Sequence, residues 1–257
     1  GFTLASGTLR DLQDTDVYKN GQIYVQSLSS MIPVLVLDPK PEETILDLTA
    51  APGSKTTQIG SRMRNTGHII ANDNSPISIH KLEANLHMQG VTNTKVTHIA
   101  GQILWQTYPE YFDKALVDAP CSMEGRYSLQ DPSESGEWSI KRIQSLSDRQ
   151  KWLLRAAVSA TKPEGTIVYS TCTLAPEENE EVVAWLLKKE KGAVILEDIA
   201  IDNLSLEDGL TKWKLKQFPE EMKKTKRITP SKTMEGFFIA KLKKLKRTIH
   251  GHLPVSE

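Results

Sequence analysis

Cysteine is scarce in this sequence: the chain has two in 257 residues, and neither belongs to a C-x-x-C pair. This scarcity fits a reducing, cytoplasmic environment, where a thiol is packed or reactive rather than bridged. The six histidines are scattered without the spacing of zinc ligands, so we expect no metal site.

Long hydrophobic runs are absent as well. No stretch of about 18 apolar residues occurs, and no charged segment followed by an apolar one opens the chain, so we expect neither secretion nor a membrane span. With 39% apolar residues the chain can bury a sizeable core. We expect a monomer with a lead-in (1–36) that packs on one large domain (37–247), and a short tail (248–257).

The net charge is zero, but the basic residues are unevenly distributed. Thirteen Lys or Arg and three Asp or Glu lie between residues 212 and 247, which gives this basic segment a charge of +10. It could provide a phosphate-binding face, or it could be a solvated helix surface and tail.

Short apolar runs of strand length alternate with segments that carry helix signals. The expected strands are residues 44–50, 68–73, 94–100, 114–120 and 165–171. The expected helices are residues 76–89, 138–161 and 177–188, the last beginning at Pro176. This alternation predicts an α/β fold with a mostly parallel sheet and helices on both faces. Ligands should then bind beyond the carboxyl ends of the strands.

The residues at these strand ends suit a nucleoside-containing cofactor. Asp47 closes the first expected strand, and the small residues Ala50, Ala51 and Gly53 follow it in the turn to the next helix. Small residues there let a ligand approach the backbone and the helix N-terminus. Asp73 ends the second strand, where a carboxylate can accept hydrogen bonds from two ribose hydroxyls.

The same turn fits a nucleotide-binding P-loop poorly. Lys55 and Thr56 match the end of that motif, but Ser54 and Thr49 stand where it requires glycine. A G-x-G-x-x-G dinucleotide fingerprint is also absent from the sequence. A nucleotide-binding ATPase is therefore the weaker alternative.

Three motifs carry a resemblance to one enzyme family. They are DLTAAPGSKT (47–56), DAPCSMEG (118–125) and STCTLAPEENEEVV (170–183). In this order and at these separations they resemble the signature motifs of the RNA cytosine-5 methyltransferases of the Nop/Sun type, which use S-adenosylmethionine. Segments 21–37 and 227–244 resemble the family's lead-in and closing strand pair, so the likeness covers nearly the whole chain. It implies a class I methyltransferase fold, with a seven-stranded Rossmann-like sheet whose last strand, from Gly236, is antiparallel.

The reaction implied by this resemblance needs two reactive groups. Carbon 5 of cytosine is a poor nucleophile, but a thiolate that adds to carbon 6 creates an enamine-like ring whose carbon 5 can attack a methyl donor. The enzyme must then remove the proton from carbon 5 and expel its own sulfur. By the resemblance, Cys172 matches the nucleophile and Cys121 matches the residue that assists release.

Residue chemistry alone leaves the two cysteine roles open. DNA cytosine-5 methyltransferases place their nucleophile in a Pro-Cys pair after the fourth strand, which is the position of Cys121. The motifs around both cysteines, however, belong to the RNA pattern, and this favours Cys172 as the nucleophile.

The resemblance implies further site residues. Asp118 matches an aspartate that contacts the cytosine edge, which would need a raised pKa to carry a proton at neutral pH. Lys55 matches a lysine close to that aspartate and the target base. The implied cofactor-binding residues are Thr49, Ala50, Ala51, Pro52, Gly53, Ser54, Lys55, Asp73, Gln102 and Asp118.

Three positions depart from the family pattern. At Gln102 the family commonly has an aspartate that contacts adenine, and glutamine lacks its charge. Met123 stands where glycine is more usual, and the arginine-rich stretch is reduced to Arg126. We therefore expect an altered cofactor contact and an unusual substrate preference.

We expect the chain to transfer a methyl group from S-adenosylmethionine to carbon 5 of a cytosine in tRNA or rRNA. The basic segment is the candidate RNA-binding surface, with Trp213 and Phe218 available to stack on an unpaired base. A catalytically silent RNA-binding or assembly factor with the same fold is the alternative. Taken singly, the cysteines could also be small core residues and the aspartates could be caps.

We expect three acidic residues after Cys172 to favour the N-terminus of a helix and to do no more than that. They are Glu177, Glu178 and Glu180.

Overall fold

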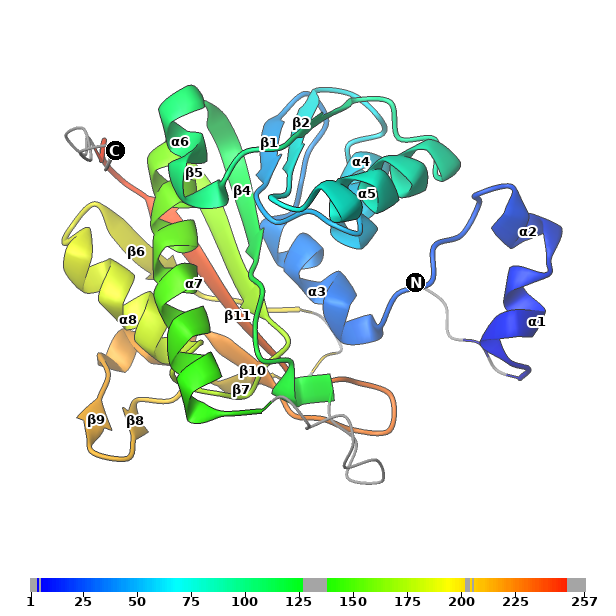
Figure 1. Ribbon diagram of the computed structural model, residues 1–257. Helices are drawn as coiled ribbons and strands as arrows, with labels where there is room; N and C mark the ends of the chain where they lie inside the picture. Colours follow the sequence, from blue (N-terminus) through cyan, green and yellow to red (C-terminus); the bar gives the residue numbers. More distant parts are fainter. Residues whose placement is uncertain (1–3, 5, 127–137, 202–203, 205, 249–257) are drawn as a thin grey trace.

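A nine-stranded sheet forms the centre of the part of the chain that the structure describes, which comprises residues 4, 6–126, 138–201, 204 and 206–248 (Figure 1). The computed structural model orders its strands β3-β2-β1-β4-β5-β11-β10-β7, and β6 also pairs with β11. The five neighbouring parallel strands are β1 (Thr44–Asp47), β2 (His68–Asn72), β3 (Thr94–Thr97), β4 (Phe112–Asp118) and β5 (Thr161–Thr171).

An antiparallel strand follows the parallel half of the sheet. β11 (Phe237–Lys244) runs antiparallel to β5, as predicted from Gly236 onward. Its other edge pairs with β10 (Lys226–Ile228) and with β6 (Val194–Glu197), and β7 (Glu207–Asp208) pairs with β10. The fold class is therefore confirmed. The expected strand number of seven was wrong for the described residues because β10 and β7 extend the edge of the sheet.

Helices cover both faces of the sheet (Figure 1). One face carries α3 (Leu28–Leu37), α4 (Ser54–Arg62) and α5 (Pro76–Met88), and the other carries α6 (Leu104–Thr107), α7 (Ile140–Ala160) and α8 (Glu180–Lys189). Short 3-10 helices lie at η1 (Gly101–Ile103), η2 (Glu124–Arg126) and η4 (Glu220–Lys224).

Side-chain alternation along the strands explains the two layers. In β1, Ile45 packs with α3 and α4, whereas the next residue, Leu46, packs with α7. In β4, Leu116 and Val117 divide in the same way. Since successive strand residues point to opposite faces, a continuous apolar run is what a sheet covered on both faces requires.

The lead-in reaches the sheet through α3. The helices α1 (Leu9–Gln13) and α2 (Asp16–Lys19) have no buried residues and lie to one side, at the right of Figure 1. The segment between α2 and α3 contacts α5, where the Gln89 side chain donates to the Ile23 carbonyl at 3.1 Å. The proposed division at residues 36 and 247 stays a prediction, and the expected tail lies outside the described residues apart from Thr248.

The three expected helices are present, and their boundaries differ from the prediction by a few residues, most at the start of the third helix. The expected helices at 76–89 and 138–161 correspond to α5 and α7. The expected start of the third helix at Pro176 was wrong, because residues 175–179 form turns and α8 begins at Glu180. Among the described residues, no helix combines the length and the apolar character needed to cross a membrane.

Candidate active site

The two cysteines lie side by side at the carboxyl ends of β4 and β5. Cys172 directly follows β5, Cys121 lies shortly after β4, and their Sγ atoms are 3.3 Å apart. Both are free thiols. The parallel register of these two strands pairs Asp118 with Ser170, and this pairing brings the two following loops together.

The two thiols differ in acidity because of their contact. The interaction with the Cys172 sulfur, followed by burial, raises the pKa of Cys121 well above its ordinary value. The hydrogen bond from Cys121 lowers the pKa of Cys172, although burial opposes the shift. Cys172 is therefore the sulfur that more readily becomes a thiolate, the reactive form of cysteine. With Cys172 ionised, the hydrogen bond between the two sulfurs is donated by Cys121.

An ion pair lies beside the thiols. Lys55 Nζ, from the first turn of α4, is 2.6 Å from Asp118 Oδ2 and also donates to Ser30 Oγ at 2.7 Å. The second carboxylate oxygen, Asp118 Oδ1, accepts from Ser170 Oγ at 2.7 Å. The ammonium is nearly buried and lies 5.5 Å from the centre of the Phe237 ring. The structure thus brings together the four residues that the sequence predicted as catalytic, while their roles stay predictions.

A buried carboxylate joins the two cysteine loops. Glu178 Oε1 and Oε2 accept from Ser122 Oγ (2.5 Å) and Ser122 N (3.1 Å), and Oε2 also accepts from Gln150 Nε2 at 2.7 Å. Ser122 Oγ lies 2.7 Å from Thr173 Oγ1. Because Ser122 follows Cys121 and Thr173 follows Cys172, one carboxylate supports both thiols. Burial raises the pKa of Glu178.

The predicted role of the three acidic residues after Cys172 was therefore wrong. Glu178 supports the thiol loops, Glu180 is fully buried and binds Arg227 through both carboxylate oxygens, and Glu177 accepts from Trp213 Nε1. The sequence carries no reliable signal for Glu178, because it lies in the turns before α8 and not on a face of that helix.

The loop after Cys121 is fixed against β11. Gly125 N donates to the Cys172 carbonyl at 3.0 Å, and Gly236 N donates to the Gly125 carbonyl at 2.7 Å. A Cβ on Gly125 would lie 2.1 Å from the Gly236 carbonyl oxygen, so a side chain cannot fit. Met123 has a left-handed φ of 61°, a conformation that glycine adopts most easily. This explains why glycine is the more usual residue there.

The expected cofactor residues surround the ends of β1, β2 and β3. Asp73 Oδ2 accepts from Ala51 N at 3.3 Å, which links the end of β2 to the turn after β1. Asn72, which the sequence reasoning missed, donates to the Leu48 and Ile99 carbonyls and so joins all three strand ends. Gln102 lies half-buried in η1, after the third strand.

The turn after β1 contains two features of a ligand site. Gly53, in a left-handed conformation with φ 108°, precedes α4, and a Cβ there would lie 2.9 Å from Leu82 Cδ1. Asp47 Oδ2 accepts from Thr56 Oγ1 at 2.7 Å, whereas Asp47 Oδ1 is buried and has no hydrogen-bond partner among the described residues. Burial raises the pKa of Asp47 to about 7. An unpartnered buried acceptor suits a bound molecule that carries a donor.

The basic segment does not form one continuous cationic face. Figure 1 shows it extending from the hairpin of β8 (Lys212–Trp213) and β9 (Lys216–Gln217) to β11. Several of its cations are paired with carboxylates, and Lys244 is fully buried beside Glu110. Phe218 is partly buried and packs against the core, which leaves less of its ring accessible, and stacking of Trp213 and Phe218 on RNA stays a prediction. In the described part of the chain, no group of three or more potential metal ligands occurs.

Comparison with known proteins identifies relatives over most of the chain. The ribosomal RNA small subunit methyltransferase F of Pectobacterium carotovorum subsp. carotovorum is 40% identical over 240 residues, which cover 91% of this chain and 46% of that protein. The tRNA (cytosine(49)-C(5))-methyltransferase of Pyrococcus abyssi is 43% identical over 228 residues, covering 88% and 72%. The chain thus spans about half the length of several curated relatives.

Solved structures similar to this chain include a methyltransferase homologue and cover most of its length. A methyltransferase homologue from Pyrococcus horikoshii has a TM-score of 0.79 and 36% identity, covering 91% of this chain and 72% of that one. NSun6 from the same organism, with SFG, has a TM-score of 0.76 and 34% identity, covering 91% and 56%. The family described as 16S rRNA methyltransferase RsmB/F matches residues 34–243. With its paired thiols at the ends of β4 and β5, the chain belongs to the RsmB/F methyltransferase family, in agreement with the Nop/Sun resemblance of its motifs.

Proposed function

We propose that the chain catalyses methyl transfer from S-adenosylmethionine to carbon 5 of a cytosine in RNA. The contact between the Cys121 and Cys172 sulfurs, 3.3 Å apart, carries this proposal, because the reaction needs one group to attack the base and another to release it. The relatives are named for methylation of small-subunit rRNA and of cytosine 49 in tRNA. Both RNA classes are therefore candidate substrates.

Cys172 is the proposed nucleophile. Its lowered pKa increases the thiolate fraction near neutral pH. The sulfur adds to carbon 6 of the cytosine, and the electron pair of the ring's 5,6 double bond shifts toward carbon 5 and the ring nitrogen and oxygen. Carbon 5 thereby becomes nucleophilic.

Asp118 and Lys55 are the proposed partners of the cytosine ring. Electron density that the addition pushes onto the ring needs a proton or a hydrogen-bond donor at its edge. The Lys55 ammonium lies 2.6 Å from Asp118, and Ser170 holds the second carboxylate oxygen. Both charged groups are thus held beside the thiols before a base arrives, which is the preorganisation that such stabilisation requires.

Cys121 is the proposed base for release. Its pKa is raised first by the interaction with the Cys172 sulfur. Once Cys172 has become a thioether, it cannot become an anion, and this cause of the raised pKa is removed. Cys121 can then lose its proton and take the proton from carbon 5. The electron pair returns to the ring, the double bond re-forms, and the Cys172 thiolate leaves.

S-adenosylmethionine, when bound, supplies the electrophilic methyl group. The proposed contacts are Asp73 for the ribose, Gln102 for the adenine side, and the turn from Thr49 to Ser54. The unpartnered Asp47 Oδ1 and the left-handed Gly53 support a ligand at this turn, and the NSun6 relative was solved with SFG.

The proposed activity can be tested directly on RNA. The chain is incubated with S-adenosylmethionine and, separately, with unmodified tRNA and rRNA, and the nucleosides are analysed by mass spectrometry. We expect 5-methylcytidine to appear in at least one RNA class. Absence of 5-methylcytidine from both, together with no heat of S-adenosylmethionine binding by calorimetry, would instead indicate a catalytically silent RNA-binding factor.

A further inference from the structure

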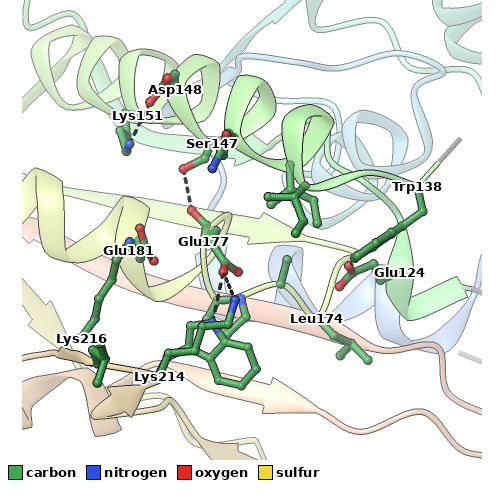
Figure 2. A pocket seen from close by; sticks show the side chains of 17 residues that line it. Glu124, Trp138, Ser147, Asp148, Lys151, Leu174, Glu177, Glu181, Lys214 and Lys216 are labelled. Atoms are coloured by element: carbon green, nitrogen blue, oxygen red, sulfur yellow. Dashed lines mark hydrogen bonds and ion pairs between the residues drawn. The ribbon is translucent and has the colours of Figure 1, made fainter.

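A groove of about 790 Å³ lies between α7 and the β8–β9 hairpin (Figure 2). One wall comes from the N-terminal half of α7, and the other comes from the hairpin, with Trp213 and Lys214. Leu174, Ala175 and Pro176, which follow Cys172 closely in the chain, also line it. We call this the α7 groove.

Two tryptophans give the α7 groove aromatic surfaces. Trp138 Nε1 donates to Glu124 Oε1 at 2.6 Å, and Trp213 Nε1 donates to Glu177 Oε1 at 3.1 Å. These bonds fix the polar edge of each indole. Trp138 remains 48% exposed, and Lys214 Nζ lies 5.2 Å from the centre of the Trp213 ring. Because Lys214 covers one face of the Trp213 indole, a flat, uncharged group would stack on the other face of that ring or on the exposed Trp138.

Three of the four carboxylates that line the groove are paired with lysines, and the fourth, Glu124, accepts from Trp138 and Thr173. Glu177 binds Lys214 (3.2 Å), and Glu181 binds Lys216 (2.6 Å). The two lysine side chains are 67% and 59% exposed, so their ammonium groups lie toward solvent. Because Glu177 and Glu181 are each paired with a lysine, they add little net charge to the inside of the groove. The ammonium groups of these lysines lie at its outer edge. This arrangement suits a nucleobase inside the groove and phosphates outside it.

One residue links the lining of the groove to the loop after Cys172. Glu124, which lines the groove, accepts from Thr173 Oγ1 at 3.3 Å, and Thr173 directly follows Cys172. A cytosine that reaches Cys172 must leave its base stack. Its neighbour in the strand then loses a stacking partner, and the aromatic α7 groove lies on the side of the loop that follows Cys172.

We propose that the α7 groove binds an unpaired nucleobase adjacent to the target cytosine, stacked on Trp138 or Trp213, with its phosphates near Lys214 and Lys216. This site rests on the proposed function, because it presumes an RNA strand whose cytosine lies at Cys172. It extends that function by naming where the chain holds single-stranded RNA.

The test measures binding alone, without S-adenosylmethionine. Fluorescence anisotropy compares a labelled single-stranded RNA of mixed sequence with the same strand carrying abasic residues. Trp138→Ala and Trp213→Ala should each weaken binding of the base-bearing strand about tenfold, the scale of one base–aromatic stack. Neither variant should alter the weaker binding of the abasic strand. Trp213→Phe, which keeps an aromatic face and loses the N–H group, should retain most of the affinity.

A matched control comes from α7. Trp152 is also exposed, at 41%, but its ring packs against Trp185 outside the groove. Trp152→Ala should therefore leave RNA binding unchanged.

Wild-type affinity in both groove variants would overturn the proposal, as would equal wild-type affinity for base-bearing and abasic strands. Unchanged RNA binding with a loss of affinity for a lysine-rich peptide would assign the groove to a protein partner instead. Because no turnover is measured, failure of methylation and failure of this site are distinguishable.

Discussion

At the scale of single residues, each sulfur in the thiol pair changes the chemistry of the other. Cys121 acts as a hydrogen-bond donor, and this lowers the pKa of Cys172 while its own pKa is raised. The same contact would make the two proposed roles sequential, because attack by Cys172 would remove the main cause that raises the pKa of Cys121.

The acidity of Cys172 can be measured through its alkylation. In the wild type, Cys172 should react with iodoacetamide faster than Cys121 near neutral pH, because the thiolate is the nucleophile. Cys121→Ala removes the donor, so the pKa of Cys172 should rise and its pH–rate profile should move to higher pH. Peptide mass spectrometry across a pH series gives both rates. If the pH–rate profile of Cys172 is the same in Cys121→Ala as in the wild type, Cys121 does not control the pKa of Cys172.

Asp47 should make stability depend on pH. Burial raises its pKa in the folded chain from 3.8 to about 7, so the folded state holds a proton that the unfolded state loses. The stabilisation is present below the unfolded pKa and is lost as pH rises through the folded pKa, at up to roughly 1.4 kcal/mol per pH unit.

Asp47→Asn isolates this effect. Asparagine can still accept from Thr56, but it does not ionise. The variant should be more stable than the wild type by a few kcal/mol at about pH 8, and the difference should shrink toward about pH 4. Urea unfolding of both proteins at several pH values measures it. A difference that is constant with pH would contradict the assignment.

At the scale of elements, the active site depends on how the entry to α8 is attached to β4 and β5. Glu178 accepts from the loop after β4 and from Gln150 of α7, and its carbonyl accepts from Tyr169 of β5 at 2.6 Å. Three elements therefore meet at one residue that touches neither sulfur. Its proposed role is to position the thiols.

Replacing Glu178 should lower the activity and the reactivity of Cys172, because Glu178 holds the loops that carry the two thiols. Both carboxylate oxygens of Glu178 accept hydrogen bonds from Ser122 or Gln150. In Glu178→Gln an NH₂ group, which donates, replaces one of these oxygens, and the lost bonds should destabilise the folded protein by about 1–3 kcal/mol. We expect lower kcat with KM little changed, and slower alkylation of Cys172 near neutral pH. Glu180→Gln is the matched control, because Glu180 is equally buried but pairs with Arg227 instead of bonding to Ser122 and Gln150.

The control should lose stability but keep the wild-type alkylation profile of Cys172. If Glu178→Gln and Glu180→Gln change the alkylation of Cys172 equally, Glu178 contributes to stability only and does not position the thiols.

The limits of prediction from sequence follow from these contacts. Local apolar runs predicted the parallel strands, and motif spacing predicted that Lys55, Asp118 and both cysteines would meet. Contacts such as Lys55 with Ser30 or Glu180 with Arg227 depend on how separate elements pack, and no local pattern encodes them. The resemblance implied a strand pair in residues 227–244, which β10 and β11 form, but β7 was missed because a strand of two residues leaves almost no periodic signal.

At the scale of the whole molecule, charge segregation along the chain does not persist in space. The sheet distributes the basic segment from the β8–β9 hairpin to β11, where acidic residues from the rest of the chain pair with it. RNA recognition by this part of the protein is therefore expected at the aromatic α7 groove rather than on a broad cationic face. The thiol site and the groove together form the proposed surface for one unpaired strand.

The most direct test of the account is covalent trapping by the thiol pair. Cys121→Ala, incubated with S-adenosylmethionine and the RNA that the wild type methylates, should accumulate protein joined to RNA that migrates as a slower band on a denaturing gel. Cys172→Ala should give no such band. A band from Cys172→Ala and none from Cys121→Ala would contradict the assignment of attack to Cys172 and release to Cys121.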